Sequence, residues 1–136
     1  MTLKLIYPAL AQILWTFIVL GIVFVRRRRA FLDKAVSPAD VAVSTERYPE
    51  PARLAAANYT NQFEAPVLFF ALIMVAMEVG AVGTLMAVLA WLFVLSRVVH
   101  TFVHVGSNRL HLRAIVFGLG IACLVCMWIS ILTTML

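Results

Sequence analysis

The chain has 136 residues, of which 64% are hydrophobic and 12% are charged, with a formal net charge of +5. Soluble domains are about 45–50% apolar and about 25% charged, so this composition excludes an ordinary soluble fold and indicates an integral membrane protein. The basic residues flank the apolar segments as membrane topology requires, which argues against a nucleic-acid partner. The length predicts one domain over residues 1–136.

The first expected membrane span covers residues 5–25 and carries no charge. Its length matches the roughly 20 residues that a bilayer core requires. Arg26-Arg27-Arg28-Arg29 follows directly. A basic run beside a span indicates the cytoplasmic side and contact with lipid headgroups, and a ligand-binding role for one or two of these arginines stays open. Residues 26–57 are then expected to form a polar cytoplasmic loop, in which Pro49 and Pro51 exclude a regular helix.

The second expected span, residues 58–79, begins with unusually polar turns. Asn61 and Glu64 are three residues apart, so they are neighbours on the surface of a helix. Pro66 follows them. A carboxylate inside a membrane is costly unless it is paired, so Glu64 is expected either to bind a partner or to turn towards the headgroups.

The third expected span, residues 84–105, carries the most informative pattern. Arg97, His100 and His104 recur at i, i+3 and i+7 and therefore share one face of a helix. A cation and two imidazoles at membrane depth need partners or water. The two histidines could instead bind a metal, but no third ligand has suitable spacing and Arg97 would repel a cation, so no metal site is expected.

A short turn with Arg109 and Arg113 precedes the fourth expected span, residues 114–136. Almost all basic residues outside the spans lie in this turn or in the loop 26–57, so the positive-inside rule places both termini on the non-cytoplasmic side. Short connections favour an antiparallel four-helix bundle. The polar ends of the second and third spans then meet at the cytoplasmic face.

Two pairs of small residues stand out in the fourth span. Cys123 and Cys126 match a Cys-x-x-Cys motif, but an apolar helix favours two small core side chains over redox chemistry. Gly118 and Gly120 are expected to let this helix approach a neighbour closely.

The expected cytoplasmic site combines many cations with one carboxylate. Its candidate residues are Arg29, Asn61, Glu64, Arg97, His100, His104, Arg109 and Arg113. Such a site suits a compact anion with several carboxylates and an amine, because guanidinium groups bind carboxylates and Glu64 can accept an ammonium. A bundle this small has little internal room, so a site between the subunits of an oligomer is expected.

Four short elements occur in a recognisable order. They are Arg28-Arg29-Ala30-Phe31, Asn61-Gln62-Phe63-Glu64-Ala65-Pro66, Arg97-Val98-Val99-His100-Thr101, and the pair Arg109 and Arg113. Together they resemble the membrane-associated proteins in eicosanoid and glutathione metabolism, above all the short bacterial members. The resemblance implies a homotrimer of four-helix subunits in a bacterial inner membrane. It also implies lipids and a lipophilic substrate as partners.

The resemblance further implies glutathione as co-substrate, bound between subunits near the cytoplasmic face. Asn61, Glu64, Arg97 and His100 would hold the tripeptide, with Arg29, His104 and Arg109 beside them. Arg113 would stabilise the thiolate, because a nearby cation favours the ionised form of a thiol. The protein would then be a microsomal-type glutathione transferase or peroxidase, in which this thiolate attacks a lipophilic electrophile from the bilayer.

Three positions depart from the family pattern. Ala57 stands where members often carry an arginine, and His104 stands where they carry a tyrosine, and both changes weaken the expectation of glutathione binding. Ala114 replaces a serine of prostaglandin synthase, which argues against that isomerase. A non-catalytic assembly or lipid-binding protein with the same fold remains the main alternative. A small multidrug transporter is disfavoured because the first span lacks a carboxylate.

Overall fold

The computed structural model describes residues 2–136, and this part of the chain is 81% helix without a strand. Its elements are α1 (Leu3–Leu32), α2 (Pro38–Val41), α3 (Glu50–Thr60), the 3₁₀ helix η1 (Asn61–Phe63), α4 (Ala65–Glu78), α5 (Thr84–Val105) and α6 (Leu110–Met135). Four stretches are long and apolar enough to cross a membrane: α1, α3 to α4 taken together, α5 and α6. The expected all-α membrane architecture is confirmed.

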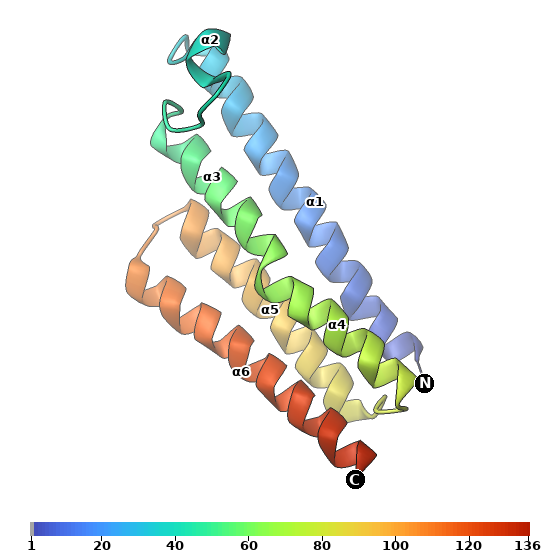
Figure 1. The fold of residues 1–136 in the computed structure, drawn as a ribbon. Coiled ribbons are helices and arrows are strands. Elements are labelled where there is room, and N and C mark those ends of the chain that lie inside the picture. The colour runs from blue at the N-terminus through green and yellow to red at the C-terminus, as the bar shows by residue number, and fades with distance from the viewer. Residues whose placement is uncertain (1) are drawn as a thin grey trace.

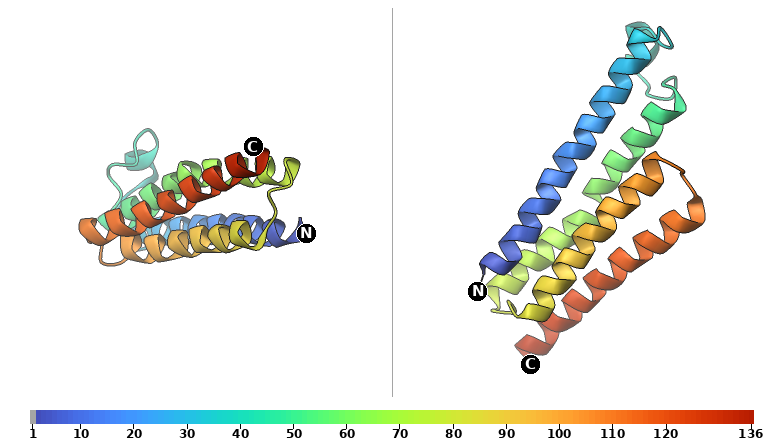
Figure 2. Two further views of the ribbon diagram at one scale, coloured as in Figure 1. Left: turned by 90° about the horizontal axis from the view of Figure 1, so that it is seen from below. Right: turned by 180° about the vertical axis from the view of Figure 1, so that it is seen from behind.

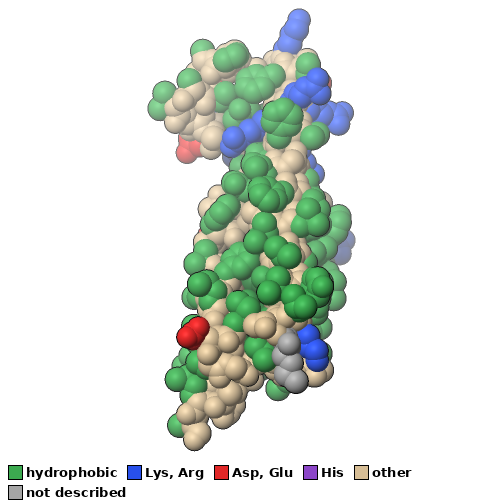
Figure 3. Space-filling model, turned by 90° about the vertical axis from the view of Figure 1, so that its right-hand side faces the viewer, with side chains coloured by type: hydrophobic (Ala, Val, Ile, Leu, Met, Phe, Trp, Pro, Cys, Tyr) green, Lys and Arg blue, Asp and Glu red, His purple; other side chains and the backbone are tan. Residues whose placement is uncertain are grey.

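The helices run alternately up and down and pack in two layers. Helix α1 lies beside α5 in one layer, and the α3–α4 segment lies beside α6 in the other (Figure 2). Both termini and the turn 79–83 lie at one end of the bundle (Figure 1). The loop 33–49 and the turn 106–109 lie at the other end, which we call the loop end. Hydrophobic side chains cover the length of the bundle, and most visible Lys and Arg side chains gather at the loop end (Figure 3).

Helix α1 is longer than the expected first span. It continues through all four arginines to Leu32, because arginine is a good helix former and no proline or glycine interrupts the run. The helix ends where Lys34 adopts a φ of 53°. Its 30 residues extend over about 45 Å, so its last turns project beyond a hydrocarbon core of about 30 Å.

The second helical segment also differs from the expected loop boundary. Helix α3 begins at Glu50, so the interpretation of the Pro49–Pro51 stretch as non-helical is wrong from Glu50 onwards. Pro49 is the N-cap and Pro51 lies in the first turn, where the missing N–H would have no helical partner. The true connection between α1 and α3 is therefore shorter than the expected 26–57 loop.

A break divides this second segment within the membrane. Helix α3 passes into η1, and Glu64 then has φ −100° and ψ −98° before α4 begins. Pro66 explains the break, because its ring clashes with the carbonyl of Gln62, four residues earlier, and it has no N–H to donate to that carbonyl. The break places Asn61 and its main-chain carbonyl beside α5.

Apolar packing fills the half of the bundle nearer the termini. Phe69 of α4 stacks on Phe93 of α5 with ring centroids 4.6 Å apart. Gly120 allows α6 to approach α5, because a Cβ there would lie 2.8 Å from Ser96 Oγ. A Cβ on Gly118 would meet nothing within 4 Å, so no helix of the same chain approaches closely at Gly118.

Candidate functional site

Buried polar side chains gather where α1, α3 and η1 meet α5. Those between 0% and 2% exposed are Gln12, Asn58, Gln62, Arg97, His100, Thr101 and His104. With the half-buried Trp15, Asn61 and Arg113, they form two adjoining groups. The first, which we call the polar cluster, consists of Asn61, Arg97, His100, His104 and Arg113. The second, which we call the amide network, consists of Gln12, Trp15, Asn58, Gln62 and Thr101.

Arg97 is the centre of the polar cluster. It is 1% exposed and lies about 12 Å along α5 from the end of that helix. Its Nη2 donates to the main-chain carbonyl of Asn61 at 3.1 Å. The ion pairs found within residues 2–136 are confined to Arg29–Asp33 and Arg47–Asp40, so Arg97 has no carboxylate partner there. A buried cation that forms no ion pair is costly in a membrane, and it favours an anionic ligand.

The two histidines follow Arg97 on the same buried face of α5, as their spacing predicted. Their rings meet edge to face with centroids 5.5 Å apart. The side-chain Nδ2 of Asn61 lies 3.5 Å from Nδ1 of His104. The amide donates in this contact when His104 carries its ring proton on Nε2. Asn61 thus contacts α5 twice, once through its main chain and once through its side chain.

Arg113 joins the polar cluster from α6. Its Nη1 donates to Oδ1 of Asn108 at 2.7 Å. Asn108 has a φ of 47°, a conformation that asparagine tolerates better than most residues. Phe117 lies one helical turn after Arg113, and its ring centroid is 6.0 Å from Cζ of Arg97 and 6.1 Å from the ring of His100. Phe117 therefore connects the Arg113 turn with the buried groups of α5.

Several polar atoms of this cluster have no hydrogen-bond partner. Within the part of the chain that the structure describes, they are Nε of Arg97, Nδ1 of His100 and Nε of Arg113. A buried donor or acceptor without a partner costs about 1–3 kcal/mol. These three atoms together offer hydrogen bonds that an anionic ligand with several polar groups could complete.

The amide network supports the cluster from the side of α1. Gln12 donates to the side-chain oxygen of Gln62 at 3.1 Å, and Gln62 donates to the carbonyl of Asn58 at 3.3 Å. Thr101 Oγ1 donates to Asn58 Oδ1 at 3.4 Å and accepts from Trp15 Nε1 at 3.2 Å. Trp15 is half-buried, and its indole N–H is held by α5 inside the bundle. These bonds hold α1, α3 and η1 against α5 immediately beside Asn61.

Arg26 has an unexpected structural role in positioning the cluster. Its guanidinium donates to the carbonyl of Pro51 at 3.0 Å and to the carbonyl of Val105 at 3.2 and 3.3 Å. The Val105 carbonyl lies at the end of α5, where the last carbonyls lack intrahelical partners. Arg26 thus ties α1 to the start of α3 and to the turn of α5 that carries His104.

Three expected site residues lie outside the polar cluster in the single chain. Arg29 is exposed and its Nε lies 3.6 Å from Oδ2 of Asp33. Glu64 is exposed at the start of α4, and Arg109 is exposed as the N-cap of α6. The chain therefore brings together Asn61, Arg97, His100, His104 and Arg113, while Arg29, Glu64 and Arg109 face outwards.

The sequence also left several supporting residues unassigned. Gln12 is the one amide in the first apolar span, and this was a usable signal, since such a group needs a partner in lipid. Asn108 follows Gly106 and Ser107 in a tight turn, which is typical of a residue with a positive φ. Phe117 had no distinguishing signal, because it lies in a continuous apolar run.

Fold and site together define a class of protein: an integral membrane protein with four spanning helices and a buried site of arginine, histidine and amide groups towards one end. The MAPEG family model matches residues 5–133, nearly the whole chain. The chain therefore belongs to the MAPEG family, the membrane-associated proteins in eicosanoid and glutathione metabolism. This family includes glutathione transferases and related proteins. Comparison with curated proteins and with solved structures gave no match.

Proposed function

We propose that this protein binds glutathione at the polar cluster, in a homotrimer, and directs it against lipophilic electrophiles from the bilayer. The observation that carries the proposal is the buried guanidinium of Arg97, which forms no ion pair within residues 2–136 and leaves Nε without a partner. Glutathione has two carboxylates and suits a site rich in guanidinium groups. Family members generally use glutathione, which supports the same ligand.

The residues divide into binding and activating groups. Arg97 would bind a ligand carboxylate through Nε and Nη groups, and His100 would add a hydrogen bond through Nδ1. Asn61 holds His104 in position through its amide. Glu64 is exposed at the broken helix, so it would meet a ligand ammonium from the outer side of η1, at a contact between subunits.

Glutathione, when bound, would supply a nucleophilic thiolate. Arg113 would lie beside the sulfur, where a cation favours loss of the thiol proton. Its guanidinium is held by Asn108, so it is already oriented before a ligand arrives. The surrounding helices would exclude bulk water from one side of the site, which strengthens the attraction between the guanidinium and the thiolate.

The direct test is equilibrium binding of glutathione to the purified oligomer in detergent, measured by isothermal titration calorimetry. We expect saturable binding that weakens at least tenfold in Arg97→Lys, a loss of about 1.4 kcal/mol. Lysine keeps the charge but loses the planar fork. Arg53→Gln is the matched control, because Arg53 is exposed on α3 and lies outside the polar cluster.

A second variant separates binding from activation. Arg113→Gln should bind glutathione with little change but require a higher pH to form the thiolate, which ultraviolet absorbance of the bound thiolate reports. Absence of binding by the wild-type oligomer up to millimolar glutathione would overturn the proposal and favour a non-catalytic membrane protein with the same fold.

A further inference from the structure

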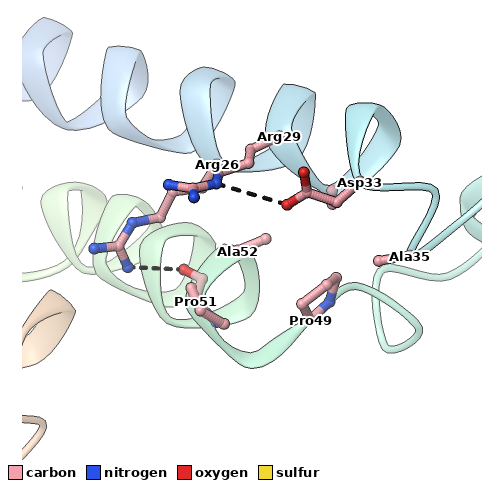
Figure 4. A pocket seen from close by; sticks show the side chains of 8 residues that line it. Arg26, Arg29, Asp33, Ala35, Pro49, Pro51 and Ala52 are labelled. Carbon is pink, nitrogen blue, oxygen red and sulfur yellow. Dashed lines mark hydrogen bonds and ion pairs between the residues drawn. The ribbon is translucent and has the colours of Figure 1, made fainter.

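A cavity of about 310 Å³ lies between α1 and the start of α3, at the loop end (Figure 4). The residues that matter most in its lining are Arg26, Arg29, Asp33, Ala35, Pro51 and Ala52. No member of the polar cluster lines it. Within one chain the cavity is therefore separate from the polar cluster.

The depth of the cavity corresponds to the headgroup layer of a bilayer. The apolar stretch 5–25 of α1 rises over about 31 Å, which matches a hydrocarbon core of about 30 Å. Arg26 is the first residue beyond this stretch, and Asp33 follows two turns later. Headgroups occupy roughly the next 5–8 Å on each side of the core. The cavity thus opens where lipid phosphates are concentrated.

The charges in the cavity suit a phosphodiester. Arg26 and Arg29 contribute +2 and Asp33 contributes −1, so the lining carries +1. Arg26 is already bonded to the Pro51 and Val105 carbonyls. Arg29 is 81% exposed in its side chain and contacts Asp33 only through Nε, so its two terminal nitrogens remain accessible. A guanidinium edge of this kind binds a phosphate with two parallel hydrogen bonds.

An apolar path leads from the cavity towards the membrane. Arg29 and Asp33 also line a second hollow, together with Phe24, Val25, Arg28 and Leu32. Phe24 is 67% exposed and Val25 is 62% exposed on the outer face of α1. A ligand with its phosphate at Arg29 could therefore extend apolar chains over these side chains, which a soluble phosphate could not do.

We propose that this cavity binds the headgroup of an anionic phospholipid, with the phosphodiester on Arg29 and the acyl chains over Phe24 and Val25. The net charge of +1 favours a lipid with a net charge of −1 over a zwitterionic one. Asp33 would orient Arg29 and accept a hydrogen bond from hydroxyl groups of a glycerol headgroup. The site would be specific in position, whereas the remaining basic residues of the loop end attract anionic lipids only by general electrostatics.

The test measures lipid binding by native mass spectrometry of the detergent-purified oligomer, titrated with phosphatidylglycerol or phosphatidylcholine of the same chain length. Two variants disrupt the proposed lipid site in different ways. Arg29→Gln removes the charge, and Ala35→Phe fills the cavity without changing any charge. Arg53→Gln and Ala39→Phe are the matched controls, because both residues are exposed at the same end but line neither hollow. Circular dichroism checks that each variant keeps its helices.

We expect phosphatidylglycerol to bind the wild type at least fivefold more tightly than phosphatidylcholine, and both site variants to lose this preference while both controls keep it. Equal loss in Arg53→Gln would overturn the proposal, because it would indicate general electrostatic attraction. Displacement of the lipid by glycerol 3-phosphate at equal concentration would assign the cavity to a soluble phosphate instead. Displacement by glutathione would assign it to the glutathione site and would likewise overturn the proposal.

Discussion

The guanidinium of Arg97 in α5 donates to the main-chain carbonyl of Asn61, 3.1 Å away, at the point where the second span breaks. In a continuous α-helix that carbonyl would face the N–H of Ala65. The break therefore gives a buried arginine a main-chain acceptor that an unbroken helix would keep for itself. Pro66 breaks the helix, and the carbonyl of Asn61 that is freed by the break orients the guanidinium of Arg97.

Replacement of Pro66 by alanine tests this relationship. Alanine allows α3 and α4 to join, so the Asn61 carbonyl would return to the helix and Arg97 would lose its acceptor. A hydrogen bond to a charged group contributes about 1.5–3 kcal/mol, so glutathione affinity should fall roughly tenfold to a hundredfold while helix content stays the same or rises. Calorimetry and circular dichroism measure the two effects. Pro8→Ala is the control, since Pro8 lies near the start of α1, away from the cluster.

Replacement of Arg26 by glutamine should loosen the loop end. The change removes hydrogen bonds to Pro51 and Val105, and we expect a loss of about 1–3 kcal/mol in the free energy of unfolding. Amide hydrogen exchange in the last turn of α5 should become faster. Denaturant unfolding in detergent and exchange mass spectrometry measure these changes. The adjacent Arg28 is exposed, so Arg28→Gln should leave both quantities unchanged, and an equal effect would contradict the structural role of Arg26.

The two glycines of α6 should respond in opposite ways to alanine. Gly120→Ala brings a methyl group to within 2.8 Å of Ser96 Oγ, which is itself bonded to the Phe93 carbonyl at 2.6 Å. We expect it to destabilise the protein by about 1–3 kcal/mol. Gly118→Ala meets open space and should stabilise the helix by up to about 1 kcal/mol. Thermal unfolding of the two variants gives the comparison, and equal midpoints would show that α5 and α6 do not depend on close approach at Gly120.

The loop 33–49 should keep its local structure in mild acid. Hydrogen bonds from Ser37, and then the contact with Arg47, lower the pKa of Asp40 from 3.8 to about 2. Because the folded pKa is lowered, the stabilisation is fully present above about pH 4 and is lost as the pH falls towards 2. Nuclear magnetic resonance of the Asp40 carboxyl carbon measures the titration. Arg47→Gln should raise this pKa, and an unchanged value would exclude the Arg47 contact in solution.

Local patterns in the sequence predicted the number of membrane helices and the buried face of α5. The periodicity of Arg97, His100 and His104 placed them on one buried face, and the apolar stretches located four membrane helices. The helix limits were less predictable. The four arginines after the first span suggested a loop, but they continue α1 to Leu32. Pro49 and Pro51 also suggested a loop, but they lie at the start of α3.

Long-range partners were beyond the reach of local patterns. Arg26 contacts carbonyls 25 and 79 positions away, and Gln12 contacts an amide 50 positions away. Nothing in the arginine run separates Arg26 from Arg28, since their difference arises only from the side of α1 on which each lies. The outward positions of Arg29, Glu64 and Arg109 likewise depend on where the helices end and break.

The amide network has a consequence for how the protein is made. During synthesis α1 enters the bilayer first, carrying the amide of Gln12, and its acceptor on Gln62 arrives only with the second span. Thr101, whose hydroxyl accepts a hydrogen bond from the Trp15 indole, is inserted later still with the third span. An amide without partners in lipid costs several kcal/mol, so α1 is expected to depend on the translocon or a chaperone until those spans are inserted. Correct lateral assembly of the first three helices would then coincide with the moment at which Gln12 and Trp15 find their partners.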